Sequence, residues 1–252
     1  MLRWAKKGWC LCLLMWPIGL FAAPIEIKVG GYDFPPYVSH NVSTNRYSGV
    51  SLDILRALNH LQDKFTFRFV STSRHNRHAA FTRKRFDLIL FENLEWGWQR
   101  LNVQQSLPLV LDKNLLLTHQ QNLGEQDQLF APGHNYTVVL FDAAYQSQHL
   151  SDEGFAVNSC SHVMNCIKLV VKRRADFTMV NESFYLPLTR QKPSLLQSLK
   201  SIAHFSPVHS LHALQRADSS LSVEQLNFFF KQLSLSGELQ AILSQYDLAI
   251  AE

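Results

Sequence analysis

Short apolar stretches alternate with amphipathic ones along this chain, and that alternation constrains the fold more than any other feature. The stretch 25–31 (IEIKVGG) alternates apolar and polar residues, as a strand does, and ends in two glycines. The stretch 47–61 (YSGVSLDILRALNHL) then carries apolar side chains at helical spacing. A strand, a loop and a helix in this order are the opening of an α/β unit.

The same alternation continues to the end of the chain. Mostly apolar strands between helices fit a sheet that is covered on both faces. A polar stretch at 119–135 separates two such sets, so the length suits one large domain or two lobes. The further elements expected are strands at 65–70, 86–91, 113–118, 136–141 and 175–180, helices near 74–84, 143–150, 162–173 and after Asn181, extended pieces at 201–205 and 208–214, and terminal helices at 222–234 and 237–246.

The N-terminus has the pattern of an export signal. Three basic residues among the first seven precede an apolar run at 9–21, which ends in the small pair Ala22 and Ala23. The run is too short for a good membrane span. We expect cleavage after Ala22, because cleavage one residue later would leave Pro24 at the cut. The mature protein is therefore expected in the periplasm.

The charge of the chain comes mostly from this signal. Loss of its three positive charges lowers the formal net charge of +4 to +1. A nucleic-acid partner then loses its main support, because such partners are recognised by a basic surface. No later stretch approaches 18 uninterrupted apolar residues, so no further membrane anchor is expected.

Two of the four cysteines lie in the apolar run of the signal and leave with it. The other two, Cys160 and Cys166, would be exported to an oxidising compartment, where a disulfide is expected. A zinc site formed by Cys160, His162 and Cys166 is the alternative, but no fourth ligand lies nearby in the sequence.

Five segments in order carry a resemblance to a known family. They are 32–38 (YDFPPYV), 47–55 (YSGVSLDIL), 83–90 (RKRFDLIL), 172–183 (KRRADFTMVNES) and 226–246 (LNFFFKQLSLSGELQAILSQY). Together they resemble the bacterial extracytoplasmic solute-binding proteins of family 3, the amino-acid receptors of ABC importers. Phe86 stands where that family has a glycine, so the third match is partial.

The resemblance implies an α/β, two-lobed periplasmic-binding-protein fold of type II, with two hinge crossovers. Lobe one would comprise 24–117 and 210–252, and lobe two 118–209. The lobes would close over a ligand by a hinge motion.

Arg100 falls where the family keeps an arginine that grips a ligand carboxylate, a task that suits the planar fork of a guanidinium. An exposed arginine is the alternative. Glu92, Asn93 and Glu95 stand where the family often has hydroxyl or small polar residues. A carboxylate about 4 Å from a ligand carboxylate would cost on the order of 4 kcal/mol at an effective dielectric of 20. Either the acids turn away and pair with Arg100, or the ligand presents a cation there.

Aromatic residues are the next candidates for ligand contact. Phe34 and Tyr37 fall where the family stacks an aromatic ring on the ligand, although both could instead close the loop as core residues. Tyr32, Trp96 and Trp98 could complete an aromatic wall for a cationic or cyclic ligand, or could pack the lobe.

The expected ligand contacts of lobe two are Asp142 and Asn181. Residues 142–145 (DAAY) replace the family's anion-binding loop, and Asn181 replaces its usual acid for an α-ammonium group. Asp53 matches an acid that mainly starts a helix. The paired histidines of 74–78 (RHNRH) and 209–212 (HSLH) are expected on solvated faces.

These patterns predict a periplasmic solute-binding protein that captures a small polar ligand for an ABC-type importer. The expected partners are that ligand and an inner-membrane ABC permease or sensor, and we expect a monomer with no cofactor, metal or nucleic acid. A second class is an interaction module of the same fold that signals to a membrane partner. The third is an enzyme of the cyclohexadienyl dehydratase type, with Glu92 or Glu95 as a general acid or base.

Overall fold

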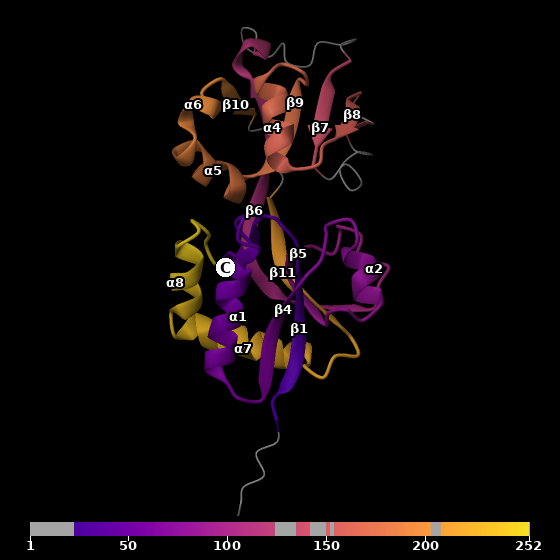
Figure 1. Ribbon diagram of the computed structural model, residues 1–252, viewed down its shortest axis with the longest axis vertical. Coiled ribbons are helices and arrows are strands. Elements are labelled where there is room, and N and C mark those ends of the chain that lie inside the picture. Colours follow the sequence, from indigo (N-terminus) through magenta and orange to yellow (C-terminus); the bar gives the residue numbers. More distant parts are fainter. Residues whose placement is uncertain (1–22, 124–134, 142–149, 152–153, 203–207, 252) are drawn as a thin grey trace, which may run out of the picture.

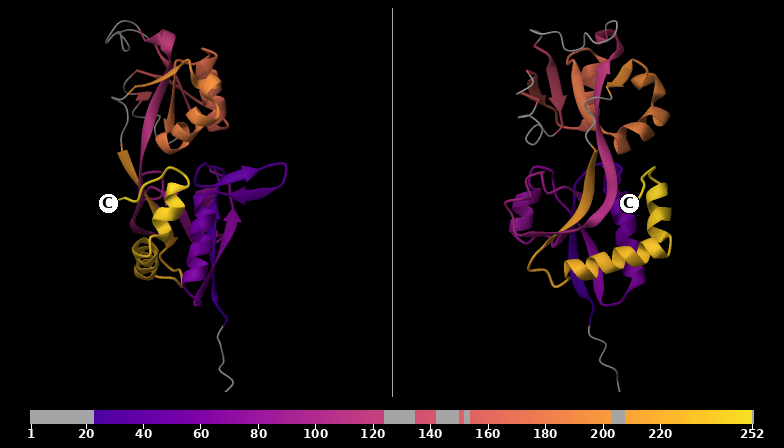
Figure 2. Two further views of the ribbon diagram at one scale, coloured as in Figure 1. Left: turned by 90° about the vertical axis from the view of Figure 1, so that its left-hand side faces the viewer. Right: turned by 180° about the vertical axis from the view of Figure 1, so that it is seen from behind.

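The computed structural model describes residues 23–123, 135–141, 150–151, 154–202 and 208–251. Two lobes lie one above the other along the longest axis, and two long strands pass between them (Figures 1 and 2). The α/β class and the two-lobed arrangement with two crossovers are confirmed. No helix among the described residues is long and apolar enough to cross a membrane.

Lobe one is built around three parallel strands. The order of the sheet at this end is β4, β1, β5, with β11 antiparallel to β5. Helices α1, α7 and α8 lie together beside this sheet, and α2 lies at its other side (Figure 1). The bounds are β1 Ile25–Gly31, β2 Ser39–Asn41, β3 Arg46–Ser48, α1 Val50–Leu61, β4 Phe65–Ser71, α2 Arg77–Thr82, β5 Leu88–Glu92, α7 Val223–Leu235 and α8 Glu238–Ser244.

Lobe two continues the same sheet. The strand order is β6, β9, β7, β8, and β10 pairs with β6 off this path. Strand β7 is parallel to β8 and to β9, whereas β9 is antiparallel to β6. The bounds are η1 Gln120–Asn122, β7 Thr137–Leu140, β8 Ala156–Ser159, α4 Val163–Val171, β9 Phe177–Asn181, α5 Glu182–Gln191, α6 Pro193–Leu196 and β10 Leu199–Ile202.

The two crossing strands are β6, Val103–His119, and β11, Val208–Arg216. They pair with each other from Val103 to Lys113 of β6, and from Asn114 onward β6 pairs with β9 of lobe two instead. The sequence predicted only residues 113–118 of β6, because exposed residues interrupt the apolar pattern of the earlier part. Since both strands run continuously through the join, the lobe boundaries at 117/118 and 209/210 stay a prediction.

Each lobe has its own hydrophobic core. The core of lobe one gathers buried side chains from β1, β4, β5, α1, α7 and α8. Lobe two has one buried cluster on each face of its sheet, as expected for a sheet covered on both sides. Phe86, which replaces a glycine in the resemblance, is fully buried, and its ring lies against Gly30, where a Cβ would come within 2.7 Å of it.

Cys160 and Cys166 form a disulfide, with 5.7 Å between their Cα atoms. The predicted disulfide is confirmed, and the zinc alternative is wrong because both sulfur atoms are bonded to each other. Cys166 is fully buried in α4, so the bridge ties the loop before this helix to the core of lobe two.

Most predicted elements are present with shifted ends. The helix expected at 74–84 is shorter, since α2 covers only Arg77–Thr82. The helix expected around 143–150 lies almost entirely outside the described residues. The stretch 208–214 belongs to strand β11. The sequence predicts a solvated His212, and this is wrong because His212 is buried. Its Nδ1 lies 2.8 Å from the carbonyl oxygen of Ser106.

Candidate functional site

The loop after β1, residues 32–38, lies where the two lobes meet. Its place is fixed by the start of α1, whose Val50 and Ser51 amides donate to the carbonyl oxygens of Pro36 and Tyr37 at 3.2 and 3.0 Å. Gly49 makes this approach possible. It has φ +120°, and a Cβ at this position would lie 2.8 Å from both carbonyl oxygens.

A buried carboxylate on the crossing strand β6 joins the lobes. Asp112 Oδ2 accepts hydrogen bonds from the Tyr37 hydroxyl at 2.7 Å and from the Ser183 hydroxyl at 2.6 Å. The amide side chain of Asn181 donates to the same oxygen at 3.1 Å. Asp112 Oδ1 accepts from the backbone amides of Ser183 at 3.2 Å and Lys113 at 2.9 Å. Tyr37 belongs to lobe one, whereas Asn181 and Ser183 belong to lobe two.

This arrangement keeps the Tyr37 hydroxyl protonated. The ring is buried and stacked on Phe91, with 4.6 Å between ring centroids. Burial, with the negative charge of Asp112 as the second cause, raises the pKa of Tyr37 well above its ordinary value. A protonated hydroxyl is the form that can donate to Asp112, so the contact between the lobes is maintained across neutral pH.

A second contact between the lobes is made by a cation and three aromatic rings. The guanidinium carbon of Arg74, in the loop before α2, lies 5.8 Å from the ring centroid of Tyr32 and 5.4 Å from that of Phe34. It lies 4.7 Å from the ring centroid of Phe141, which follows β7 in lobe two. These distances are within the range of cation–π attraction.

Glu92, the first of the two acids in the segment 92–100, makes its contacts inside lobe one. Glu92 is fully buried, and its Oε2 accepts a hydrogen bond from Trp98 Nε1 at 2.7 Å. Its Oε1 lies 3.3 Å from Nε of Arg77, which is also buried. Nη1 of Arg77 in turn donates to the carbonyl oxygen of Arg74 at 2.6 Å. The Glu92–Arg77 pair therefore fixes the loop that presents Arg74.

Of the predicted contact residues, Phe34, Tyr37 and Asn181 are brought together where the lobes meet. Asn93 has another role, because its Nδ2 donates to the carbonyl oxygen of Ser210 at 3.0 Å and ties the turn to β11. Asp142 lies outside the described residues.

One of the two alternatives for the glutamates, a pair with Arg100, is absent among the residues that the structure describes. Glu92 pairs with Arg77, whereas Glu95 and Arg100 are both exposed. Neither of these two side chains makes a hydrogen bond or ion pair with any other residue that the structure describes. The pairing differs because Glu92 ends a buried strand and pairs inside the lobe, while Arg100 lies at the exposed end of the turn.

The aromatic wall expected from Tyr32, Trp96 and Trp98 is only partly present. Trp98 is fully buried and packs against Phe81 and His78, so its role is packing. Trp96 packs edge-on against His209, with 5.5 Å between ring centroids. Tyr32 is the member of this set that lies against Arg74. Burial raises the pKa of its hydroxyl, and the nearby Glu92 charge adds to the rise.

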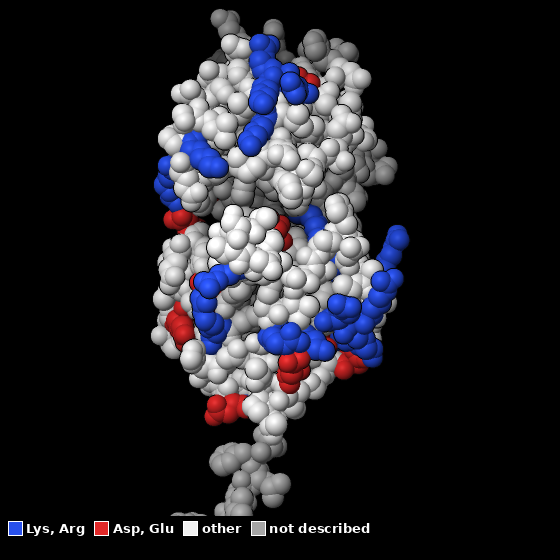
Figure 3. Space-filling view, viewed as in Figure 1, with Lys and Arg blue, Asp and Glu red and all other residues white. Residues whose placement is uncertain are grey.

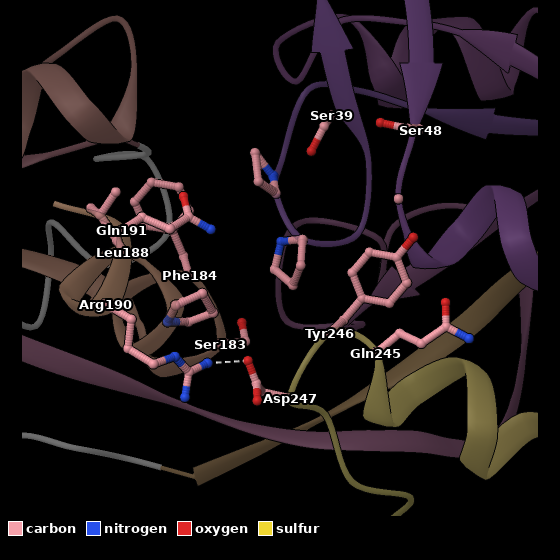
Figure 4. A pocket seen from close by; sticks show the side chains of 14 residues that line it. Ser39, Ser48, Ser183, Phe184, Leu188, Arg190, Gln191, Gln245, Tyr246 and Asp247 are labelled. Atoms are coloured by element: carbon pink, nitrogen blue, oxygen red, sulfur yellow. Dashed lines mark hydrogen bonds and ion pairs between the residues drawn. The ribbon is translucent and has the colours of Figure 1, made fainter.

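A cavity of about 400 Å³ also opens between the lobes. Pro35, Pro36, Ser39, Ser48 and Gly49 line it from lobe one, Ser183, Phe184, Pro187, Leu188, Arg190 and Gln191 line it from α5, and Gln245, Tyr246 and Asp247 line it from the segment after α8. Figure 4 shows Phe184 and Tyr246 on opposite sides of it and Arg190 paired with Asp247 at its edge.

The loop 32–38 separates this cavity from the aromatic contact. It gives Tyr32 and Phe34 to the contact with Arg74, and Pro35 and Pro36 to the cavity. The helices α5 and α8 beside the cavity and the elements α2 and β7 beside Arg74 lie on opposite sides of the crossing strands (Figure 1). The space-filling view shows the groove between the lobes, with Lys and Arg gathered on the α2 side of lobe one (Figure 3).

Asp53 has the structural role expected of it and one more contact. It lies in the first turn of α1, and its Oδ2 accepts a hydrogen bond from the Tyr246 hydroxyl at 2.7 Å. Burial and this hydrogen bond raise the pKa of Tyr246 to about 12. The contact holds the segment after α8 against lobe one, beside the cavity.

Solved structures share the fold of this chain over most of its length. An ancestral arginine-binding protein bound to arginine is 16% identical, with a TM-score of 0.70, covering 89% of this chain and 99% of that one. The ligand-binding core of GluR0 in complex with L-glutamate is 18% identical, with a TM-score of 0.70 and the same coverage. A histidine kinase sensor domain with similarity to periplasmic binding proteins is 14% identical, with a TM-score of 0.73, covering 91% and 99%.

This chain has the type II periplasmic-binding-protein fold. No family model and no curated protein matches the sequence, so the likeness is one of structure. On this binding-protein fold, the join between the lobes holds Asp112, Ser183 and Arg74, which sequence reasoning missed. A signal for Asp112 was available, since it is a lone acid within the apolar strand segment 109–117. Arg74 and Ser183 gave no comparable signal, because their importance depends on contacts with the other lobe or the crossing strand.

Proposed function

We propose that the mature chain is a periplasmic solute-binding protein that captures a small polar ligand between its lobes and delivers it to an ABC-type importer. The ligand class is an amino acid or a related amine or carboxylate. One observation carries the proposal: polar and aromatic side chains of both lobes converge at the crossing strands, with Asp112 between Tyr37 and Ser183. The amino acids bound by the arginine-binding protein and the GluR0 core support the ligand class.

Three of the predicted contacts remain proposed ligand contacts, namely Phe34, Tyr37 and Asn181. Their support is their position where the lobes meet, on the loop after β1 and at the start of α5. Asp142 remains a proposed contact from the resemblance alone. Glu92 and Asn93 are assigned to fixing the turn after β5, and Glu95 and Arg100 to the exposed face of that turn.

Export to the periplasm is part of the proposal. Its support is the basic and apolar pattern of the first residues, with cleavage after Ala22. The Cys160–Cys166 disulfide is consistent with an oxidising compartment. Mass spectrometry of the exported protein checks this step, and we expect an N-terminus at Ala23.

The ligand test is calorimetric titration of the mature protein with amino acids, polyamines and small carboxylates. Saturable binding of one class with a stoichiometry of one supports the proposal. The matched variants are Phe34→Ala, which should weaken binding at least tenfold, and Val42→Ala, an exposed residue of the β2–β3 hairpin that should leave binding unchanged. A well-folded protein that binds no ligand of these classes would contradict the proposal.

A sensory role is the second candidate, because one similar structure is a histidine kinase sensor domain. In that role the ligand still binds between the lobes, but the partner is a signalling protein rather than a permease. Deletion of the gene separates the two roles. Loss of uptake of the identified ligand supports import, whereas intact uptake with a lost ligand-dependent transcriptional response supports sensing.

We propose binding without turnover. The acid best placed in sequence for general acid or base catalysis, Glu92, is buried and paired with Arg77, so it does not offer a proton to a ligand between the lobes. Incubation with prephenate-like acids, followed by NMR, should show no product. Formation of a dehydrated product that is lost in Glu92→Gln would favour an enzyme.

A further inference from the structure

The guanidinium of Arg74 lies among aromatic rings of both lobes. Its guanidinium lies 4.7 to 5.8 Å from three ring centroids, two from the loop after β1 and one from lobe two. Tyr32 and Phe34 are themselves stacked at 5.9 Å with 22° between their planes, so they form one side of the site together. Phe141 forms the other side. The rings of both lobes therefore surround the guanidinium of Arg74, which belongs to the chain.

Buried groups of lobe one fix the position of the Arg74 backbone. Arg77, three residues later, is almost fully buried, and it donates from Nη1 to the carbonyl oxygen of Arg74. Arg77 also lies 5.5 Å from the Tyr32 ring centroid and pairs with Glu92. The backbone of Arg74 is thus attached to the core of lobe one, which directs its side chain toward the rings.

Aromatic faces attract a cation through the ring quadrupole, and a planar guanidinium also stacks on them. Once a guanidinium lies among the three rings, a second organic cation must displace it to reach the ring faces. A neutral or acidic ligand does not compete for these faces as a cation. Occupying a site against a competing ligand is an effective way to set specificity.

We propose that Arg74 is a built-in occupant of the aromatic site and that it excludes basic amino acids and other organic cations from the groove between the lobes. This inference rests on the proposed function, because it concerns the same groove. It narrows the ligand class to neutral or acidic molecules of amino-acid size. The arginine-binding protein of the same fold differs in this respect, since its ligand is itself a guanidinium compound.

The test replaces the built-in cation by a free one. Arg74→Ala leaves the three rings in place and should create a site for methylguanidinium. We expect Arg74→Ala to bind methylguanidinium and arginine at least tenfold more tightly than the unmodified protein. At a concentration of ten times Kd, methylguanidinium should raise the Tm of this variant by about 3 °C.

The matched control is Arg83→Ala. Arg83 is an exposed arginine at the end of α2, and its side chain has no contact with a ring among the residues that the structure describes. The Arg83→Ala variant removes the same charge from the same segment and should bind methylguanidinium and arginine as the unmodified protein does. The double variant Arg74→Ala with Phe141→Ala removes the ring of lobe two and should lose the gain in methylguanidinium binding.

A conservative variant covers the case in which Arg74→Ala does not fold. Arg74→Gln keeps a polar side chain, although a shorter one, and removes the guanidinium, so it should also bind arginine at least tenfold more tightly than the unmodified protein. Arg74→Lys keeps the charge and should continue to exclude arginine.

The result that overturns the inference is binding of arginine by the unmodified protein as tightly as by Arg74→Ala or Arg74→Gln. The inference is also wrong if both variants bind methylguanidinium and arginine no more tightly than the unmodified protein does. These outcomes are separable from failure of the proposed function. If the unmodified protein binds a neutral or acidic amino acid and the variants gain no cation binding, only this inference fails. If it binds no natural ligand but Arg74→Ala binds methylguanidinium, only the proposed function fails.

Discussion

The hydroxyl of Tyr37 donates a 2.7 Å hydrogen bond to Oδ2 of Asp112, and this bond joins lobe one to the strand that carries the chain into lobe two. The same oxygen accepts from Ser183 at 2.6 Å. One buried carboxylate thus holds together the loop after β1, the crossing strand β6 and the start of α5. The relative position of the lobes depends on this group more than on the exposed ion pair of Arg190 and Asp247.

Replacement of Tyr37 by Phe should destabilise the protein by about 1.5–3 kcal/mol, because it removes a buried hydrogen bond to a charged group. Urea denaturation measures the change. Tyr47→Phe is the matched control, since Tyr47 stacks on His40 but its hydroxyl has no hydrogen bond to another described residue. Equal stability of the two variants would contradict a role for the Tyr37–Asp112 bond.

Replacement of Glu92 by Gln should cost about 3–5 kcal/mol, because it leaves the buried Arg77 without its charged partner. Glu95→Gln, three residues later on the exposed face, should change the free energy of unfolding by less than about 0.5 kcal/mol. Chemical denaturation checks both values. If Glu92→Gln keeps full stability and instead loses ligand affinity, Glu92 is a ligand contact and its assignment as a structural acid is wrong.

Removal of the Cys160–Cys166 disulfide should lower the stability by about 2 kcal/mol, the value expected from the entropy of closing so short a loop. The measurement compares the Tm of the unmodified protein and of the double variant Cys160→Ala and Cys166→Ala, each with and without a reductant. The reductant should lower the Tm of the unmodified protein alone. A reductant effect of equal size on the double variant would show that another group is responsible.

Stability should decline at alkaline pH through the partly buried Tyr246 and the buried Tyr37. Burial and the hydrogen bond to Asp53 raise the pKa of Tyr246 to about 12, and burial raises that of Tyr37. A folded-state pKa above the unfolded value of about 10 means that the stabilisation is fully present below pH 10 and is lost as the pH rises through the folded-state pKa. For Tyr246 the loss should fall between about pH 10 and 12. Tyr246→Phe should therefore show a weaker dependence of Tm on pH in that range, and an unchanged dependence would contradict the contact with Asp53.

Local patterns in the sequence were sufficient for the α/β class, and the two-lobed arrangement followed from the resemblance. Strand β1 and helix α1 were predicted closely, because alternation and helical spacing are properties of consecutive residues. Residues 103–112 of β6 were missed because their partner is β11, about a hundred residues later, and pairing with a distant strand leaves no local signal. The same reason explains the buried His212 on β11.

The candidate site was only partly predictable. Phe34, Tyr37 and Asn181 lie where the lobes meet, as the resemblance implied. The roles of the charged residues were harder to predict, because they depend on burial and burial is a property of the packed lobes. Glu92 found its partner in Arg77, and Arg74, in a stretch expected to be a solvated face, became the cation between the rings.

The most direct test of the central claim is a crystal structure of the mature protein with the ligand that calorimetry identifies. We expect electron density for one ligand between the lobes, in contact with Phe34 or Tyr37 on one side and Asn181 on the other. Density on the outer surface of either lobe, with these side chains unoccupied by ligand, would contradict it.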